Sequence, residues 1–404
     1  MDGTAQRVLG TMLDHAVYLT PHRLTAARIT GSLVELDWSD GRTSRFHSMW
    51  LRDNCPCPIC RHPHALERRF LFIDQPEPPR VTEAKTDAAG DLSLTFAAVN
   101  GGPAHVSLFH AGWLRHHCYQ DWARTERTHE PKLWGSWLEE KLPVIDYDRF
   151  MHSDEGLTDW ITALLDYGVV LLTGAPAKAG QIQHVADRIG PIRLTNFGSI
   201  FDVISKPNPN ASADTPMGLE LHHDLPNWQY PPDIQLLFCV ANDAKGGGSV
   251  YADSFKVAAD LRTEEPAVFD RLSRQMFDFR FHDEGCDHRA RAPMIELDPD
   301  GRVTRVRFNN WLRAPFDIPE DEIEPTYDAL RRFWLRLRDP RYQLRRKLDP
   351  GEMIAVANAR VMHGRDPFDP STGHRHMQGC LMDMDWVLST LRLVERRQSS
   401  RLHL

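Results

Sequence analysis

The stretch Leu219-Glu-Leu-His-His-Asp-Leu-Pro226 contains the residues that decide the fold of the larger part of this chain. His222 and Asp224 are one residue apart, so on an extended strand both side chains point to the same face. Both are metal ligands, and together they make half of a site. His223 faces the other side of such a strand, and only a register slip would exchange it with the ligands.

A second imidazole is available about 140 residues further on. His363 follows the turn at Asp349-Pro-Gly351 and the apolar run Met353–Ala357, so we expect it just past a buried strand. Two histidines and one carboxylate on one face of Fe(II) leave the opposite face open for a cosubstrate and dioxygen. Arg375 comes twelve residues later and is suited to bind a carboxylate through two parallel hydrogen bonds. This order of residues is typical of iron- and 2-oxoglutarate-dependent dioxygenases.

Further blocks of sequence extend the pattern from about residue 30 to residue 395. With them the chain resembles the γ-butyrobetaine dioxygenase and trimethyllysine dioxygenase family. The resemblance implies a double-stranded β-helix (jelly-roll) catalytic domain, mainly β with flanking helices, behind a small β-rich zinc-binding N-terminal domain. The matching blocks are Trp50–Cys57, Arg193–Thr195, His222–Pro226, Ile234–Leu237, Gly247–Asp253, Arg307–Asn310, His363–Arg365 and Arg375–Gly379.

A second metal site is predicted in the N-terminal domain. Cys55, Cys57 and Cys60 place three thiolates on one short loop, and a closed tetrahedral zinc site needs a fourth ligand. The resemblance implies that His105 supplies it, while His62 and His64 are nearer in sequence and are the alternatives. Since such a site has no open position, its Zn(II) is expected to be structural.

The cosubstrate site follows from the same resemblance. 2-Oxoglutarate is expected to bind Fe(II) together with O2, with its far carboxylate on Arg375, and Leu237 is expected to line the cavity. Arg365 is either an ion-pair partner that supports this corner or a direct cosubstrate ligand. His374 and His376 are expected to form local hydrogen bonds.

The substrate site departs from the family pattern. Relatives that hydroxylate trimethylammonium compounds hold the cation among aromatic rings, which bind a quaternary ammonium well because it has no N–H to donate. The matching positions here are Phe197, Phe201, Asp214 and Leu381, so only two rings remain. Trp228 or Tyr230 is a candidate to restore a ring.

Asp214 leaves three possibilities open. It binds a primary or secondary amine through N–H donors, or it neutralises a trimethylammonium group at closer range, or it faces solvent. Asn309 or Asn310, with Asn196, is expected to bind the acidic end of the substrate. The expected reaction is hydroxylation of a small cationic or zwitterionic, γ-butyrobetaine-like substrate, giving succinate and CO2. An ammonium phosphonate or a primary or secondary amino acid is the alternative.

Composition sets the remaining limits. A chain of 404 residues suggests two domains, which we place at 1–128 and 140–397. A net charge of −8 argues against nucleic acid or an anionic membrane as the main partner. No apolar run approaches the roughly 20 residues that a membrane span needs. Residues 1–17 do not resemble a secretory signal. The seven cysteines, three of them within Cys55–Cys60, are more typical of a reducing compartment than of a disulfide-bonded protein. We therefore expect a cytoplasmic protein, and a homodimer.

Periodicity predicts the individual elements. Apolar residues at helical spacing predict helices over 111–127, 154–166, 181–189, 256–276, 319–337 and 386–397. The short apolar runs 168–174 and 234–240 predict strands, and 246–253 predicts a tight turn followed by a strand. Many short strands with few helices indicate a two-sheet barrel.

Two other classes of protein compete with this interpretation. One is a metal-dependent barrel enzyme, such as an isomerase or decarboxylase, that uses the same three ligands without 2-oxoglutarate; Arg375 argues against it. The other is a binding module whose cysteine-rich site recruits a partner protein.

Overall fold

The computed structural model describes residues 18–87, 90–99, 102–204 and 215–401, and these form two compact units. The first unit comprises Met1–His129 with Glu395–Leu404, and the second comprises Glu130–Val394. No helix in the described residues is long and apolar enough to cross a membrane.

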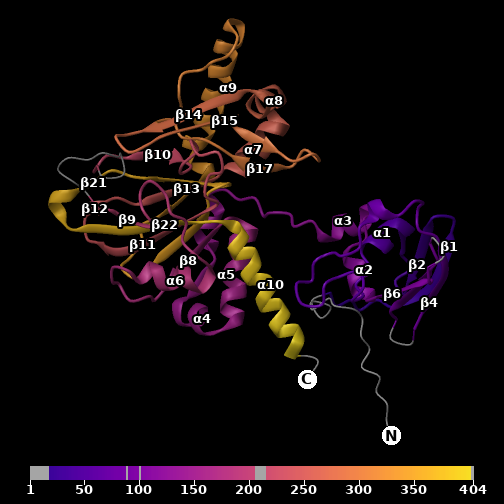
Figure 1. The fold of residues 1–404 in the computed structure, drawn as a ribbon. Coiled ribbons are helices and arrows are strands. Elements are labelled where there is room, and N and C mark those ends of the chain that lie inside the picture. The colour runs from indigo at the N-terminus through magenta and orange to yellow at the C-terminus, as the bar shows by residue number, and fades with distance from the viewer. Residues whose placement is uncertain (1–17, 88–89, 100–101, 205–214, 402–404) are drawn as a thin grey trace. The chain divides into compact units, whose positions relative to one another are not determined.

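The first unit contains two three-stranded antiparallel sheets around one core (Figure 1). Strand β2 alternates strictly, and its buried Val34, Leu36 and Trp38 face the core. The sheets are β1 (Leu24–Thr30), β2 (Leu33–Trp38) and β3 (Thr43–His47), then β4 (Val81–Thr86), β5 (Leu92–Phe96) and β6 (His105–Phe109); the helices are α1 (Ser48–Asp53), η2 (Phe72–Asp74), α2 (Ala111–His116) and α3 (Asp121–Arg127). The single helix expected over 111–127 is two helices, because the backbone leaves the helical conformation between His117 and Gln120.

The second unit is built on two facing sheets, which confirms the jelly-roll fold class. The larger sheet has the order β7 (Val144–Asp146), β8 (Val169–Thr173), β19 (Met353–Ala357), β11 (Ile234–Asn242), β22 (Arg375–Met382), β9 (Ile200–Val203). The smaller sheet has the order β10 (Leu219–His222), β20 (Val361–Arg365), β13 (Ser249–Asp253), β18 (Gln343–Arg346).

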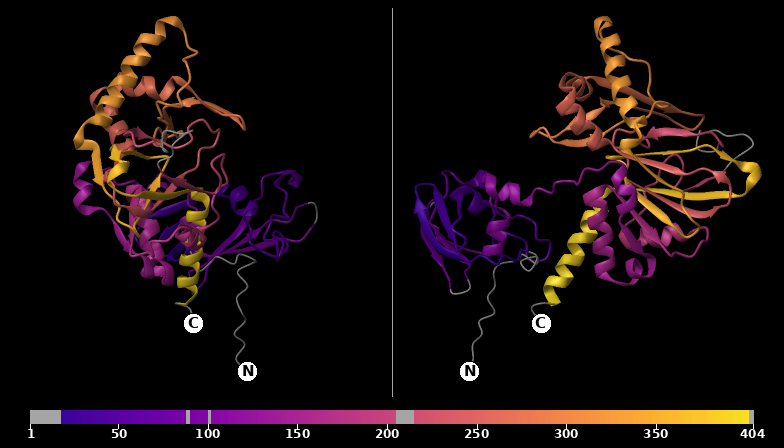
Figure 2. Two further views of the ribbon diagram at one scale, coloured as in Figure 1. Left: turned by 90° about the vertical axis from the view of Figure 1, so that its left-hand side faces the viewer. Right: turned by 180° about the vertical axis from the view of Figure 1, so that it is seen from behind.

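Alternation along the strands divides the second unit into three cores. In β13, Tyr251 packs between the two sheets, whereas Val250 and Ala252 face outward into a separate core. Helices α7 (Ser254–Glu264), α8 (Pro266–Arg274) and α9 (Glu320–Arg338) cover that outer side. The opposite side, behind the larger sheet, is covered by α4 (Tyr147–His152), α5 (Asp154–Tyr167), α6 (Gln181–Ile189) and part of α10 (Met384–Arg401), as Figures 1 and 2 show.

The helix predicted over 256–276 is broken in two. Glu265 leaves the helical conformation and Pro266 begins α8, since proline fits the first turn of a helix but not its interior. The remaining short elements are η3 (Ser136–Lys141), β12 (Lys245–Gly246), β14 (Met276–His282), β15 (Asp287–Pro293), β16 (Ile295–Leu297), β17 (Val303–Val306), η5 (Pro340–Tyr342), β21 (Phe368–Asp369) and η6 (Pro370–Thr372).

Candidate active site

Three side chains from two distant parts of the sequence meet in the barrel of the second unit. His222, at the end of β10, lies opposite His363 in the middle of β20. Asp224 Oδ1 is 3.7 Å from His222 Nε2 and 3.6 Å from His363 Nε2. His363 was expected just past a strand but lies within one. The expectation that one extended strand carries both His222 and Asp224 is wrong, because β10 ends at His222 and the turn beyond it brings Asp224 round.

Hydrogen bonds fix the orientation of these groups. His222 Nδ1 lies 2.8 Å from the carbonyl oxygen of Glu220, so Nδ1 carries the proton and Nε2 presents its lone pair. Asn358 binds the backbone N–H of Asp224 at 2.8 Å and its C=O at 3.0 Å, and Gln235 Nε2 donates to Asp224 Oδ2 at 2.5 Å. Burial lowers the pKa of His363 to about 4, which keeps its imidazole neutral and able to bind a metal.

This arrangement fits one divalent ion. Protein ligand bonds to first-row metals are about 2.1 Å long, and the two separations from Asp224 are each less than twice that length, so one ion can touch all three side chains. Two imidazoles and one carboxylate are the donor set of iron oxygenases, which leave the remaining positions open. Within the described residues, this cluster and one cysteine-rich cluster are the groups of three or more side chains able to share a metal.

Arg375 is buried without a counter-charge among the residues that the structure describes. It begins β22 on the side of that strand that faces the smaller sheet, and only 6% of it is exposed. Its Nε makes no hydrogen bond, no carboxylate of the described residues pairs with it, and burial lowers its pKa. Since an isolated buried charge is costly, this guanidinium fits a bound anion. The far carboxylate of 2-oxoglutarate meets that requirement.

Tyr251 is a neighbour of this region that the sequence analysis did not identify. It lies opposite His363 in the pairing of β13 with β20, and it is 1% exposed. Burial raises its pKa to about 12, against the opposing effects of the Ser249 side chain and the charge of Arg375, so its hydroxyl is a protonated donor. The period-two alternation of β13 was the signal that could have placed it inside the barrel.

Arg365 and Leu237 lie on different sheets of the barrel, Arg365 in β20 of the smaller sheet and Leu237 in β11 of the larger sheet. Arg365 donates to the carbonyl oxygens of Thr215 and Met217, at 2.6 and 2.7 Å, and so anchors the segment that leads into β10. Burial, with a smaller effect from Arg375, lowers its pKa to about 10. Leu237 lies on the inward face of β11, opposite Gly379.

The three other histidines near the site are not part of the metal-ligand cluster. His223 is 2% exposed and lies outside the metal-ligand cluster, and burial holds its pKa well below the usual value. Its backbone N–H donates to Phe308 at 2.7 Å. His376 forms a local hydrogen bond to Asp202 at 2.7 Å, whereas His374 is exposed.

The three asparagines expected to bind the acidic end of the substrate, Asn196, Asn309 and Asn310, differ in whether their amide groups are already hydrogen-bonded. Both amide atoms of Asn196 are buried and have no hydrogen-bond partner within the described part of the chain, which favours a polar ligand. Asn309 uses its amide nitrogen on the carbonyl of His223 and its oxygen on the backbone of residues 311 and 312, so it shapes a turn. Asn310 accepts a long hydrogen bond, 3.5 Å, from Arg313.

The expected aromatic cage is only partly present at the expected positions. Phe197 and Phe201 are in contact, with ring centroids 6.4 Å apart, and Leu381 is a buried aliphatic side chain. Asp214 lies outside the described residues. The face of Trp228 is occupied by the guanidinium of Arg193, 5.1 Å from its centroid. At the end of the turn that carries Trp228, Tyr230 is 77% exposed.

The cysteine-rich cluster belongs to the first unit. His105 Nε2 lies 3.2, 3.8 and 3.6 Å from the sulfurs of Cys55, Cys57 and Cys60. Tetrahedral zinc, with bonds of about 2.3 Å to sulfur and 2.0 Å to nitrogen, separates such atoms by about 3.5 Å, so the cluster fits structural zinc. The Arg52 guanidinium donates to Cys60 at 3.0 Å. The hydrogen bond with Cys55, and then those with His105 and Arg52, lower the pKa of the Cys60 thiol, which favours the thiolate that zinc binds.

The alternative zinc ligands His62 and His64 do not join this cluster. His62 Nδ1 instead accepts backbone N–H groups of its own loop, at 3.3 Å from His64 and 3.0 Å from Ala65.

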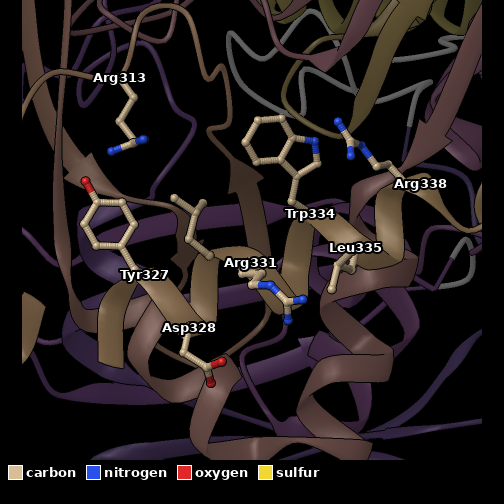
Figure 3. Close-up of a pocket in the computed structure, with 8 residues that line it drawn as sticks. Arg313, Tyr327, Asp328, Arg331, Trp334, Leu335 and Arg338 are labelled. Atoms are coloured by element: carbon tan, nitrogen blue, oxygen red, sulfur yellow. The ribbon is translucent and has the colours of Figure 1, made fainter. Parts of the chain in front are cut away.

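A separate hollow of about 590 Å³ lies along α9 (Figure 3). Two residues that line this hollow, Trp334 and Arg338, form hydrogen bonds to a residue that precedes the metal ligand His222 in β10. Trp334 Nε1 and Arg338 both donate to the carboxylate of Glu220, whose carbonyl orients His222. Arg338 lowers the pKa of Glu220 and keeps it ionised.

Two histidines and one carboxylate in a jelly roll are the metal-ligand set typical of non-heme iron oxygenases, and the same barrel buries Arg375, which has no charged partner among the described residues. Residues 129–381 match the family "Taurine catabolism dioxygenase TauD, TfdA", and residues 26–115 match the family "Gamma-butyrobetaine hydroxylase-like, N-terminal". The chain belongs to the TauD, TfdA family, in its branch of γ-butyrobetaine and trimethyllysine dioxygenases, and is an Fe(II)- and 2-oxoglutarate-dependent dioxygenase.

Three relatives show how far the similarity extends. The chain is 39% identical to the γ-butyrobetaine dioxygenase of Pseudomonas sp. (strain AK-1), over 95% of this chain and 99% of the relative. It is 33% identical to the human γ-butyrobetaine dioxygenase, over 90% and 95% respectively. It is 28% identical to the human mitochondrial trimethyllysine dioxygenase, over 87% and 83%.

Proposed function

We propose that this enzyme hydroxylates an unactivated C–H bond of a small betaine of the γ-butyrobetaine type. The single observation that carries the chemistry is the position of Arg375. It is a buried cation, unpaired among the described residues, in the barrel that holds His222, Asp224 and His363, so a dicarboxylate such as 2-oxoglutarate is suited to bind it. The betaine is suggested by the names of relatives that match nearly the whole chain.

Each residue has a defined task in this proposal. His222, Asp224 and His363 would hold Fe(II), which with 2-oxoglutarate and O2 supplies the oxidation that yields succinate, CO2 and a hydroxylated product. Arg375 would bind the far carboxylate of the cosubstrate, and the buried hydroxyl of Tyr251, opposite His363 in the sheet, would donate a second hydrogen bond to it. Leu237 would exclude water from the cavity.

The substrate would be held at both of its ends. The unpartnered amide of Asn196 is suited to the carboxylate, and the rings of Phe197 and Phe201 are suited to the trimethylammonium group. An ammonium phosphonate shares this cationic end. A primary or secondary amine would instead depend on the carboxylate of Asp214.

The test is succinate formation. The enzyme is loaded with Fe(II) and 2-oxoglutarate without oxygen, mixed with γ-butyrobetaine, trimethyllysine, an ammonium phosphonate or an unmethylated amino acid, and then exposed to air. We expect γ-butyrobetaine-like compounds to stimulate succinate release well above the substrate-free rate, with one hydroxylated product per succinate.

Matched variants locate the activity. Asp224→Ala should abolish substrate-stimulated succinate, whereas His374→Gln, at an exposed position beside Arg375, should leave it unchanged. Product formed without consumption of 2-oxoglutarate would point to a different metal-dependent barrel enzyme. Succinate stimulated only by unmethylated amines would replace the betaine with an amino acid.

We also propose that the enzyme is a cytoplasmic homodimer with no nucleic-acid or membrane partner. The net charge of −8 supports the exclusion of anionic polymers and surfaces. Light scattering coupled to size exclusion tests the dimer, for which twice the chain mass of 46.3 kDa is expected; the mass of a single chain would contradict it.

A further inference from the structure

A short two-stranded ribbon packs against the guanidinium of Arg375. Its strands are β12 and β21, in which Gly246 is opposite Phe368. The ring centroid of Phe368 lies 5.3 Å from the guanidinium carbon of Arg375, and Phe368 is 8% exposed. The turn after β12 approaches just as closely, because a Cβ built on Gly247 would lie 3.2 Å from Nε of Arg375 and 3.2 Å from Cβ of Phe368. A ring and a glycine turn therefore pack against this guanidinium.

The ribbon lies at the end of the barrel strands that is further from the metal ligands. Along β20, the ligand His363 comes first and Arg365 follows two residues later, and both pair with β13. Beyond them, the backbone N–H of Gly247 donates to the carbonyl oxygen of Pro367 at 3.1 Å. Each two residues of a strand advance about 7 Å, so the ribbon is displaced from His363 along the strands. It therefore lies behind Arg375 as seen from the metal ligands.

Phe368 is itself held in place by several contacts. Its ring centroid lies 5.0 Å from the guanidinium carbon of Arg365, which donates to two carbonyl oxygens of the segment 215–217. The backbone N–H of Phe368 donates to a third carbonyl oxygen of that segment, Pro216, at 3.1 Å. One buried ring thus contacts two guanidinium groups, and its negative face stabilises both charges. The ring is fixed by its backbone and cannot easily move aside.

This packing provides an orientation that Arg375 does not obtain from charged partners. Its Nε makes no hydrogen bond, and no carboxylate of the described residues pairs with it. A guanidinium binds a carboxylate through two parallel hydrogen bonds only when its plane has the right direction. The ring of Phe368 and the backbone of Gly247 restrict both that direction and the room for the side chain to withdraw from the metal.

We propose that Phe368 is a positioning residue that fixes the reach of Arg375 and thereby selects the length of the keto acid. The inference rests on the proposed function, in which Arg375 binds the far carboxylate of 2-oxoglutarate. A guanidinium held against Phe368 and Gly247 cannot retreat to admit 2-oxoadipate, which is longer by one methylene group. When the ring is removed, the guanidinium gains both freedom and room, so the shorter acid loses a pre-organised partner and the longer acid gains space.

The test compares two keto acids that differ only in length. Anaerobic, Fe(II)-loaded enzyme is titrated calorimetrically with 2-oxoglutarate and, separately, with 2-oxoadipate. We expect wild type to prefer 2-oxoglutarate. Phe368→Leu should weaken binding of 2-oxoglutarate by about two- to tenfold, the cost of ordering one long side chain at a binding site. It should not weaken binding of 2-oxoadipate, so the preference narrows. The KM for the betaine should not change.

Two control variants separate positioning from general stability. Phe269, in α8, is also 8% exposed and lies 4.2 Å from the guanidinium carbon of Arg262, so it matches Phe368 in burial and in its arginine contact. Phe269→Leu should leave the affinities for both keto acids unchanged. Phe368→Tyr keeps the ring and should retain most of the preference, which distinguishes loss of the ring from misfolding.

The outcomes that overturn the inference differ from those that overturn the proposed function. Unchanged affinities in Phe368→Leu, equal weakening of both acids, or a wild type without preference overturns this inference alone, provided that Arg375→Met weakens binding of 2-oxoglutarate. If wild type and Arg375→Met bind 2-oxoglutarate equally well, the proposed cosubstrate site is wrong, and this inference is wrong with it.

Discussion

Replacing Arg360 by methionine should destabilise the protein, whereas replacing Arg375, an arginine buried in the same barrel, should not. Arg360 pairs with Asp253 at 2.8 Å, and the two side chains are 5% and 0% exposed. Arg375 is just as buried and has no counter-charge among the described residues. We therefore compare Arg360→Met with Arg375→Met, since methionine keeps much of the length and apolar volume of the arginine stem.

The expected magnitudes follow from the partners. Breaking a buried ion pair leaves Asp253 uncompensated and should cost about 3–5 kcal/mol of unfolding free energy. Removing Arg375 eliminates an unpaired buried charge, so the cosubstrate-free protein should be as stable as wild type or more stable. Losing the partner of a buried carboxylate costs about 2–5 kcal/mol in binding, so the Arg375 variant should bind 2-oxoglutarate about thirtyfold to several thousandfold more weakly.

Two assays separate these effects. Urea denaturation of the cosubstrate-free protein, monitored by circular dichroism, gives the change in stability relative to wild type. Succinate formation at varied 2-oxoglutarate concentration, with the betaine saturating, gives the change in KM. The reasoning is refuted if Arg375→Met destabilises the protein as much as Arg360→Met, or if its KM for 2-oxoglutarate stays within about threefold of wild type.

Three more predictions test other parts of the account. Gln235→Leu removes the hydrogen bond to Asp224 and should weaken Fe(II) binding by about 10- to 100-fold, measured by metal titration; unchanged affinity would contradict a positioning role for Gln235. Gly379→Ala places a Cβ 2.4 Å from Cε2 of Phe201 and should displace that ring, raising the KM for the betaine but not for 2-oxoglutarate; equal effects on both would contradict it. Cys57→Ser should abolish zinc retention, whereas Cys118→Ala, at a buried cysteine outside the cluster, should keep one zinc per chain in metal analysis; zinc retained by Cys57→Ser would rule out the four-ligand site.

Sequence predicted best what depends on residue type and order. The chemistry of His222, Asp224, His363 and Arg375 restricts each to few roles, and the barrel brings them together even though β10 ends earlier than expected. The turn after β10 holds Leu225 at a φ of +52°, a left-handed conformation that a β-alternation pattern cannot anticipate.

Sequence predicted poorly what depends on contacts between distant segments. In sequence, Phe281 is one more apolar residue of an alternating strand, and only the fold brings its ring within 5.7 Å of the ring of Phe197. The predicted substitute Trp228 is covered by Arg193, a residue more than thirty positions away in sequence. Pro266 is an exception, because it marks a helix start that local sequence could have revealed.

The central claim is that one ion and one keto acid share the space between His222, Asp224, His363 and Arg375. Crystals grown anaerobically with Fe(II) and 2-oxoglutarate, with diffraction recorded at the iron absorption edge, test it directly. We predict a single iron peak within about 2.2 Å of both Nε2 atoms and an Asp224 oxygen, with the far carboxylate of 2-oxoglutarate on the guanidinium of Arg375. Iron bound elsewhere, or a carboxylate turned away from Arg375, would contradict the account.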